Sequence, residues 1–179
     1  MQRWNSKVRV LLQNETKPQI SKFSKVNPKA EIIGKVFIGD HVNIGKSKIY
    51  SESENIISVG ENTQIKDGVL ISAKDYKFNS SISETKKLKD VYIGCKVFIS
   101  SNVMISGASL ISDGVFIGYG CQIINSQIGP NSVIEAGAIV KNVTIPANTF
   151  VPSKAIINSM KKLNCSTSTI GSQGLDRIA

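Results

Sequence analysis

The chain has 179 residues, 41% of them hydrophobic, and a formal net charge of +9. No apolar run approaches the roughly 18 residues of a membrane span, which predicts a soluble protein with no transmembrane segment. Cys95, Cys121 and Cys165 are odd in number and form no CxxC pair, which argues against a disulfide framework or a cysteine zinc site. The lysines lack the stacking aromatics of a nucleic-acid motif, so nucleic acid is not an expected partner.

The N-terminal region, residues 1–27, precedes any regular repeat. Its first fourteen residues are basic, lack acidic residues and place four apolar side chains at helical spacing. This pattern faintly resembles an organellar transit segment. We prefer the interpretation that residues 1–27 form a docking segment, as a strand or a helix.

Over residues 28–152, an aliphatic residue returns every six positions. That period fits neither a helix of 3.6 residues per turn nor a single strand, and it is typical of short strands stacked as a solenoid. The sequence therefore predicts an all-β fold, a single-stranded left-handed parallel β-helix in which three hexads close each triangular coil. The repeating residues are Ile32, Ile38, Ile44, Val59, Ile65, Ile71, Ile93, Ile99, Ile105, Ile111, Ile117, Ile123, Ile128, Ile134 and Val140.

The repeat is interrupted in countable places. Residues 50–58 break it, and residues 74–90 form a polar inserted loop. Two later steps, 123–128 and 140–145, have five residues instead of six, which predicts a tightened corner.

The inserted loop can be subtracted from the count. Ile71 and Ile93 are 22 positions apart (93 − 71), which is one hexad plus a 16-residue insertion. Without the insertion, Ile71 and Ile105 are three hexads apart, which is one coil. We therefore expect Ser72 to stack directly on Ser106.

At the C-terminus, the period is expected to end at Pro152. Ser153 can cap a short α-helix that ends near Asn164. Residues 153–179 are therefore predicted as a short helix followed by a flexible tail. The apolar positions of this helix would be Ala155, Ile156, Met160 and Leu163.

Three segments carry a family resemblance: VGENTQIKDGVLISA (59–73), VYIGCKVFISSNVMISGASLISDGVFIGYG (91–120) and INSQIGPNSVIEAGAIVKNVTIPANTFVPSKAII (124–157). Together they resemble the γ-class carbonic anhydrases, and among these the γ-anhydrase domain of the carboxysome assembly protein. The resemblance covers about residues 28–160. It implies a homotrimer of left-handed β-helices in which three histidines hold zinc between adjacent subunits.

Carried onto this chain, the three zinc-ligand positions are Ser72, Ser101 and Ser106. A neutral hydroxyl is a poor zinc ligand beside imidazole, thiolate or carboxylate. Without a bound metal, no hydroxide nucleophile forms near neutral pH. The resemblance thus implies a degenerate site, and neither zinc nor another cofactor is predicted.

Other positions of the family's site also differ. Its arginine, aspartate and glutamate run aligns with Tyr50, Glu52 and Ser53, and its asparagine and glutamine align with Gln64 and Lys66. Asp67 and Gly68 are retained, which suits a structural turn. Gln64, Lys66, Asp67 and Glu52 are therefore the residues expected near the degenerate site.

Three other questions stay open. The three serines form either a packed seam between subunits or a small polar pocket for an anion such as bicarbonate, with Lys66 nearby. His41, the single histidine, is expected at a solvent-facing corner. Its functional alternative is the general base of a hexapeptide-repeat acyltransferase. A carbonic anhydrase with residual activity is the third possibility.

The function predicted from these observations is a γ-carbonic-anhydrase-like protein that has lost zinc-dependent CO₂ hydration. It would serve as a structural or assembly subunit of a larger complex, carboxysome-like or respiratory-complex-like. The expected partners are further copies in a homotrimer, or γ-anhydrase-like subunits in a mixed trimer, together with proteins of the assembly. The expected location is the cytoplasm or an organellar matrix, within a carboxysome or a membrane-associated complex.

Overall fold

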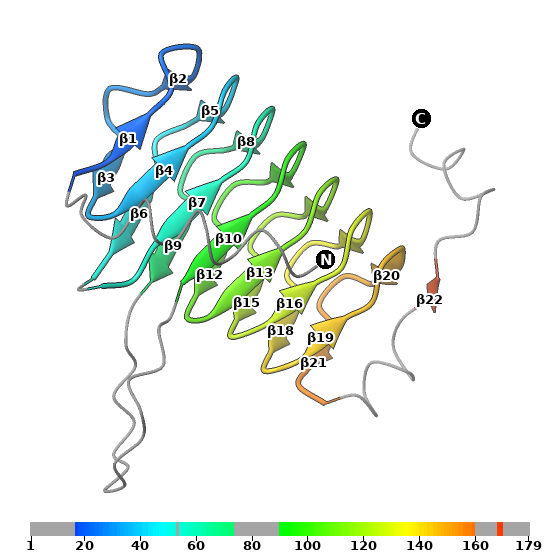
Figure 1. Cartoon of the computed structure of the whole chain (residues 1–179). Helices are drawn as coiled ribbons and strands as arrows, with labels where there is room; N and C mark the ends of the chain where they lie inside the picture. The colour runs from blue at the N-terminus through cyan, green and yellow to red at the C-terminus, as the bar shows by residue number, and fades with distance from the viewer. Residues whose placement is uncertain (1–16, 53, 74–89, 160–167, 170–179) are drawn as a thin grey trace, which may run out of the picture.

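The computed structural model describes residues 17–52, 54–73, 90–159 and 168–169. These residues form seven stacked coils, and each coil contributes one short strand to each of three parallel sheets (Figure 1). The architecture confirms the predicted left-handed β-helix.

The three faces of the solenoid are named sheets A, B and C. Sheet A contains β1 (Gln19–Ile20), β4 (Val36–Ile38), β7 (Ile57–Val59), β10 (Val91–Ile93), β13 (Ser109–Ile111), β16 (Gln127–Ile128) and β19 (Thr144–Ile145). Sheet B contains β2 (Lys25–Val26), β5 (Asn43–Ile44), β8 (Gln64–Ile65), β11 (Phe98–Ile99), β14 (Phe116–Ile117), β17 (Val133–Ile134), β20 (Thr149–Val151) and the antiparallel β22 (Ser168–Thr169). Sheet C contains β3 (Glu31–Ile33), β6 (Lys48–Ser51), β9 (Leu70–Ala73), β12 (Met104–Ser106), β15 (Gln122–Ile124), β18 (Ile139–Lys141) and β21 (Ile156–Ile157).

The hexad aliphatics point inward and form the core. Ile71, Ile105 and Ile123 are in register on successive strands of sheet C, and each is fully buried. Burying one such side chain contributes about 1.5–3 kcal/mol of stability. Because every coil adds its aliphatics to the same ladders, the core extends along the whole solenoid.

Corners between sheets require residues that accept a left-handed backbone. Asparagine tolerates positive φ better than other non-glycine residues, and six asparagines occupy this conformation at corners. The glycine that follows many hexad aliphatics has a different cause. A Cβ on Gly60 would lie 2.6 Å from the carbonyl carbon of Gly94 in the next coil, so only glycine permits this backbone approach.

The solenoid begins earlier than the expected boundary at residue 28. Strands β1 and β2 already pair with β4 and β5, so residues 19–27 belong to the first coil. Ile20 and Val26 precede Ile32 by 12 and 6 positions, and the six-residue period therefore extends back to them. The expected docking segment is thus reduced to the residues before β1, and residues 1–16 lie outside the described part.

The prediction of a helix beginning at Ser153 is wrong for residues 153–159. Ser153 and Lys154 form a turn, and Ile156–Ile157 form β21, which pairs with β18 of sheet C. Ile157 follows Val151 by six residues and is fully buried, so the hexad period outweighs the helical spacing. The rest of the predicted helix and most of the tail lie outside the described residues.

Both long interruptions leave the solenoid at the corner between sheets C and A. Residues 52–56 connect β6 to β7, and the inserted loop follows β9 in the next coil. Residues 74–89 of that loop lie outside the described residues. Ile49 of β6 stacks on Ile71, so the coil before the first interruption also keeps its aliphatic residue, after a five-residue step.

Candidate functional site

Ser72 and Ser106 are direct neighbours in sheet C, as predicted. They pair in register on β9 and β12, and their exposed fractions are 4% and 3%. Tyr50 on β6 continues the same row. Among the described residues, the Ser106 hydroxyl oxygen finds no hydrogen-bond partner although it is buried. The two serines thus form an adjacent pair in which the Ser106 hydroxyl is unsatisfied among the described residues.

Ser101 lies elsewhere on the same chain. It is in the turn between β11 and β12, at the corner from sheet B to sheet C, where its carbonyl accepts a hydrogen bond from Gly120 N at 3.1 Å. Ser106 is at the far end of β12, next to the corner from sheet C to sheet A. Within one chain, the length of strand β12 therefore separates Ser101 from the pair of Ser72 and Ser106.

Three of the four residues predicted near the site gather around Ser101. Gln64, Lys66 and Asp67 line a cleft of about 170 Å³ together with Asn43, Gly45, Ile65 and Ser101. The Lys66 ammonium lies 5.3 Å from the centroid of the Phe98 ring, within cation–π range. Asp67 Oδ1 accepts a hydrogen bond from Lys46 N at 2.7 Å, which anchors the turn.

Glu52, the fourth of these residues, lies at the corner from sheet C to sheet A, on the side of Ser72. Its backbone amide donates to Ala73 O at 3.1 Å, and its side chain is exposed. The same short insertion carries Glu54, whose carboxylate accepts from the buried Lys35 ammonium at 2.8 Å. The predicted residues thus divide between two corners of the solenoid.

Two buried polar residues at this corner were missed by the sequence analysis. Asp90 Oδ1 accepts from Ile56 N at 2.9 Å, and the Asn55 side-chain amide donates to Ala73 O at 3.1 Å. Asp90 thus satisfies a backbone amide of the short insertion, and Asn55 ties the insertion to the end of β9, so both side chains hold its conformation. Their roles depend on how the coils stack on either side of an insertion, and no local sequence motif indicates this stacking.

The donor chemistry does not fit zinc. Within residues 17–52, 54–73 and 90–159, no three histidine, cysteine, aspartate or glutamate side chains cluster in a way that could hold a metal ion. The serine hydroxyls that occupy the positions implied by the resemblance are poor ligands for Zn²⁺.

His41 lies at the corner from sheet A to sheet B, with positive φ and an exposed side chain. Its ring centroid is 5.7 Å from that of Phe23. It does not line the cleft around Ser101.

Over the described part of the chain, no helix has the length and apolar character needed to cross a membrane.

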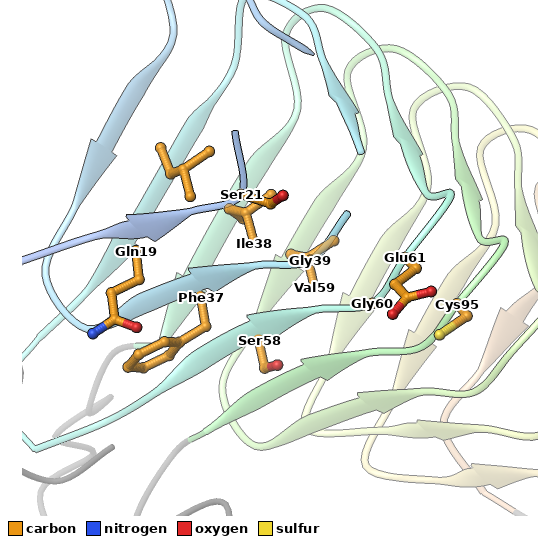
Figure 2. Close-up of a pocket in the computed structure, with 11 residues that line it drawn as sticks. Gln19, Ser21, Phe37, Ile38, Gly39, Ser58, Val59, Gly60, Glu61 and Cys95 are labelled. Atoms are coloured by element: carbon orange, nitrogen blue, oxygen red, sulfur yellow. The ribbon is translucent and has the colours of Figure 1, made fainter. Parts of the chain in front are cut away.

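Another surface depression is a groove of about 450 Å³ on the outer face of sheet A (Figure 2). Phe37 and Ser58 project from β4 and β7 into it, and Glu61 and Cys95 lie at the end toward sheet B. Its other lining residues are Gln19, Ile20, Ser21, Ile38, Gly39, Val59 and Gly60. None of the predicted site residues lines it.

Comparisons with known proteins establish the fold. No family model matches the chain. The carboxysome assembly protein CcmM of a Nostoc species is 30% identical over 112 residues, which cover 62% of this chain and 20% of that protein. The chain therefore spans about a fifth of the length of that relative.

Two solved structures share the architecture. The hexapeptide transferase family protein of Anaplasma phagocytophilum superposes with a TM-score of 0.63 at 18% identity, covering 83% of each chain. A UDP-N-acetylglucosamine acyltransferase of Bacteroides fragilis has a TM-score of 0.51 at 16% identity, covering 89% of this chain and 77% of that one. At these identities, the likeness shows a hexapeptide-repeat left-handed β-helix.

Cys121 provides a test of the core. It is fully buried at an inward corner position, and burial raises the pKa of its thiol. A raised pKa leaves less thiolate at any given pH, and the thiolate is the reactive form. We expect iodoacetamide at pH 7.5 to modify Cys121 at least about tenfold more slowly in the native protein than in urea. Peptide mass spectrometry measures both rates, and equal rates would contradict the inward placement.

Proposed function

We propose that this chain is a γ-carbonic-anhydrase-like subunit that lacks zinc-dependent CO₂ hydration and serves as a structural component of a larger assembly. The observation that carries the proposal is the register of Ser72 on Ser106. The resemblance assigns histidines to these two positions, and the fold keeps the positions adjacent while the side chains are hydroxyls. The architecture is therefore retained without the ligands that the reaction needs.

The separation of Ser101 from the serine pair supports a trimer. Ser101 and Ser106 lie at opposite ends of β12, so a second subunit must supply one half for the two to meet. Large apolar side chains are also exposed on the outer faces, including Phe116 at 41% and Ile156 at 54%. Contact between copies would cover such side chains.

The setting of the assembly is proposed as carboxysome-like or respiratory-complex-like. The partial similarity to CcmM, whose name describes a carboxysome assembly protein, favours the first. The second rests on the family resemblance alone. In both settings the flat sides of the solenoid would be the surfaces that meet neighbouring proteins.

Metal analysis combined with a CO₂ hydration assay tests the proposal. We expect the purified protein, after incubation with zinc and removal of free metal, to hold well below one zinc per chain. Hydration should then proceed at the uncatalysed rate. Light scattering on the same sample should give three times the chain mass of 19.4 kDa.

The Ser72→Ala variant is the matched control, since it removes one hydroxyl and should change neither zinc content nor hydration. Stoichiometric zinc with hydration that Ser72→Ala abolishes would overturn the structural role. A monomeric mass would overturn the shared site but leave the absence of catalysis standing.

A further inference from the structure

The two ends of the solenoid differ in how the apolar core finishes. In the last coil, the inward aliphatic residues are fully buried; they are Ile145, Val151 and Ile157. In the first coil, the equivalent residues are Ile20, Val26 and Ile32, which pair with Ile38, Ile44 and Ile49 of the second coil. Ile20 is 42% exposed, whereas Ile38 is 5% exposed. Within the described residues, the core is therefore open at the end formed by β1, β2 and β3 (Figure 1).

Two further apolar side chains are exposed on the same coil. Phe23 is 55% exposed at the corner from sheet A to sheet B, and Ile33 is 60% exposed at the end of β3. Of the seven large hydrophobic side chains exposed in the described part, Ile20, Phe23 and Ile33 thus belong to this coil. One coil is about 4.8 Å thick, so the three lie at nearly the same height along the solenoid. We call residues 17–33 the end surface.

The end surface is basic. Its charged residues are Lys17, Lys22, Lys25, Lys29 and Glu31, which sum to +3 (4 − 1). All four lysines are exposed, and the Lys22 ammonium lies 5.1 Å from the centroid of the Phe23 ring. Glu31 already has a cationic partner, since its carboxylate lies 3.1 Å from the Lys48 ammonium of the second coil. Exposed apolar side chains and uncompensated positive charge therefore share one end of the molecule.

The positive charge is concentrated toward this end. In the described part, residues 17–51 hold seven lysines and two acidic residues, Glu31 and Asp40, for a net charge of +5 (7 − 2). The described residues that follow hold four lysines and seven acidic residues, for a net charge of −3 (4 − 7). Such an asymmetry orients the solenoid in an electrostatic field, with the first coil toward an anionic surface.

The shape of the end surface selects among anionic and apolar occupants. A second copy stacked end to end would bring two surfaces of like charge to a strand spacing of about 4.8 Å, and edge lysines oppose such pairing. A peptide strand added to one sheet edge would reach one side of the triangular coil. A flat surface met end-on contacts all three sides at once, because the whole coil lies at one height.

An anionic lipid bilayer has the required chemistry. Phenylalanine and isoleucine side chains enter the boundary between headgroups and acyl chains, and lysines extend their ammonium groups to anionic headgroups. Each lysine near such a surface adds to the attraction. The unpaired edges of β1, β2 and β3 would stay in the hydrated headgroup layer, where water satisfies their backbone groups.

We propose that the first coil binds the surface of an anionic lipid bilayer end-on. Ile20, Phe23 and Ile33 enter the headgroup layer, and the lysines of the end surface contact anionic headgroups. The inference goes beyond the proposed function and does not rest on it. Its consequence is that the solenoid stands on the membrane with its three sheets facing sideways, toward neighbouring proteins.

Vesicle co-sedimentation of the full chain tests the proposal. We expect binding to phosphatidylcholine vesicles with about 30% phosphatidylserine to be at least about tenfold tighter than binding to pure phosphatidylcholine. Raising NaCl from about 0.1 M to about 0.5 M should weaken it, because salt screens the attraction. The double variant Lys22→Glu, Lys25→Glu should weaken binding at least about tenfold while its circular dichroism spectrum stays unchanged.

The matched control is the double variant Lys96→Glu, Lys141→Glu, which changes the net charge equally. Both lysines are exposed, and they lie in the fourth and sixth coils, at least about 14 Å from the end surface. That distance exceeds the Debye length of about 10 Å, so the control should bind within about twofold of the unmodified chain. Equal losses in the two double variants would overturn the proposal in favour of general charge attraction. Absence of binding to the anionic vesicles would also overturn it and leave the end surface to an acidic protein.

An environment-sensitive fluorophore tests the end-on orientation. We place it on Ile33→Cys or on Leu110→Cys, in a chain that also carries Cys95→Ser and Cys165→Ser. Leu110 lies in the fifth coil, about 19 Å from the end surface. Anionic vesicles should shift the emission of the label at position 33 to shorter wavelength and leave that at position 110 unchanged. A shift at position 110 would show side-on binding and refute the arrangement.

Discussion

Ile105→Ala is expected to lower the free energy of unfolding by about 3 kcal/mol. Ile105 is fully buried at the centre of sheet C, between Ile71 and Ile123 in the same ladder. Strands on both sides hold the backbone, so the cavity left by alanine cannot collapse easily. Urea denaturation followed by circular dichroism measures the change.

The matched control is Leu110→Ala, on the outer face of β13. Leu110 is 39% exposed, so its truncation should cost less than about 1 kcal/mol. Similar losses for the two variants would contradict the assignment of inward and outward faces. The comparison therefore tests the hexad register itself.

Gly60→Ala is expected to destabilise the protein by about 1–3 kcal/mol. The added Cβ would lie 2.6 Å from the carbonyl carbon of Gly94 and 2.8 Å from Cys95 N, both in the next coil. These are backbone atoms, so they can retreat only if the two coils separate locally. Thermal unfolding should show a lowered midpoint with an unchanged far-ultraviolet spectrum.

Gly120→Asn is the control for this variant. Gly120 has φ +67, and a Cβ there meets no atom within 4 Å. Asparagine already occupies the same conformation at Asn102, the equivalent corner of the preceding coil. Gly120→Asn should therefore be nearly neutral, and a neutral Gly60→Ala would contradict the close coil spacing.

The fold was predictable because its period is enforced by packing. A six-residue spacing of aliphatics has few structural solutions, and counting it along the sequence is enough to place Ser72 on Ser106. The two ends were harder. In the first coil, Ile20 is 42% exposed. In the last coil, Ile156 also fits the apolar spacing of a helix, which favoured the wrong prediction there. Terminal coils have a neighbour on one side, so their burial signal is weaker.

The candidate site was predictable only in part. The register located the serine pair, but it could not show that Ser101 faces the opposite corner with Gln64 and Lys66. Ser101 precedes β12 and Ser106 ends it, so the two residues lie at successive corners of one coil although they are close in the sequence. Asp90 and Asn55 escaped prediction because their hydrogen bonds tie an irregular insertion to other segments of the chain. The groove on sheet A has no motif, since its residues come from four successive coils.

The insertion between β9 and β10 also affects the order in which strands can pair during folding. Phe98 pairs with Phe116, 18 residues away (116 − 98), whereas Ile57 pairs with Val91, 34 residues away (91 − 57). Closing the longer loop costs additional chain entropy before its pairing is gained. The coils from β10 to β21 thus have a low contact order for an all-β protein and form the expected folding nucleus. The three coils before them would then add to a template that already exists.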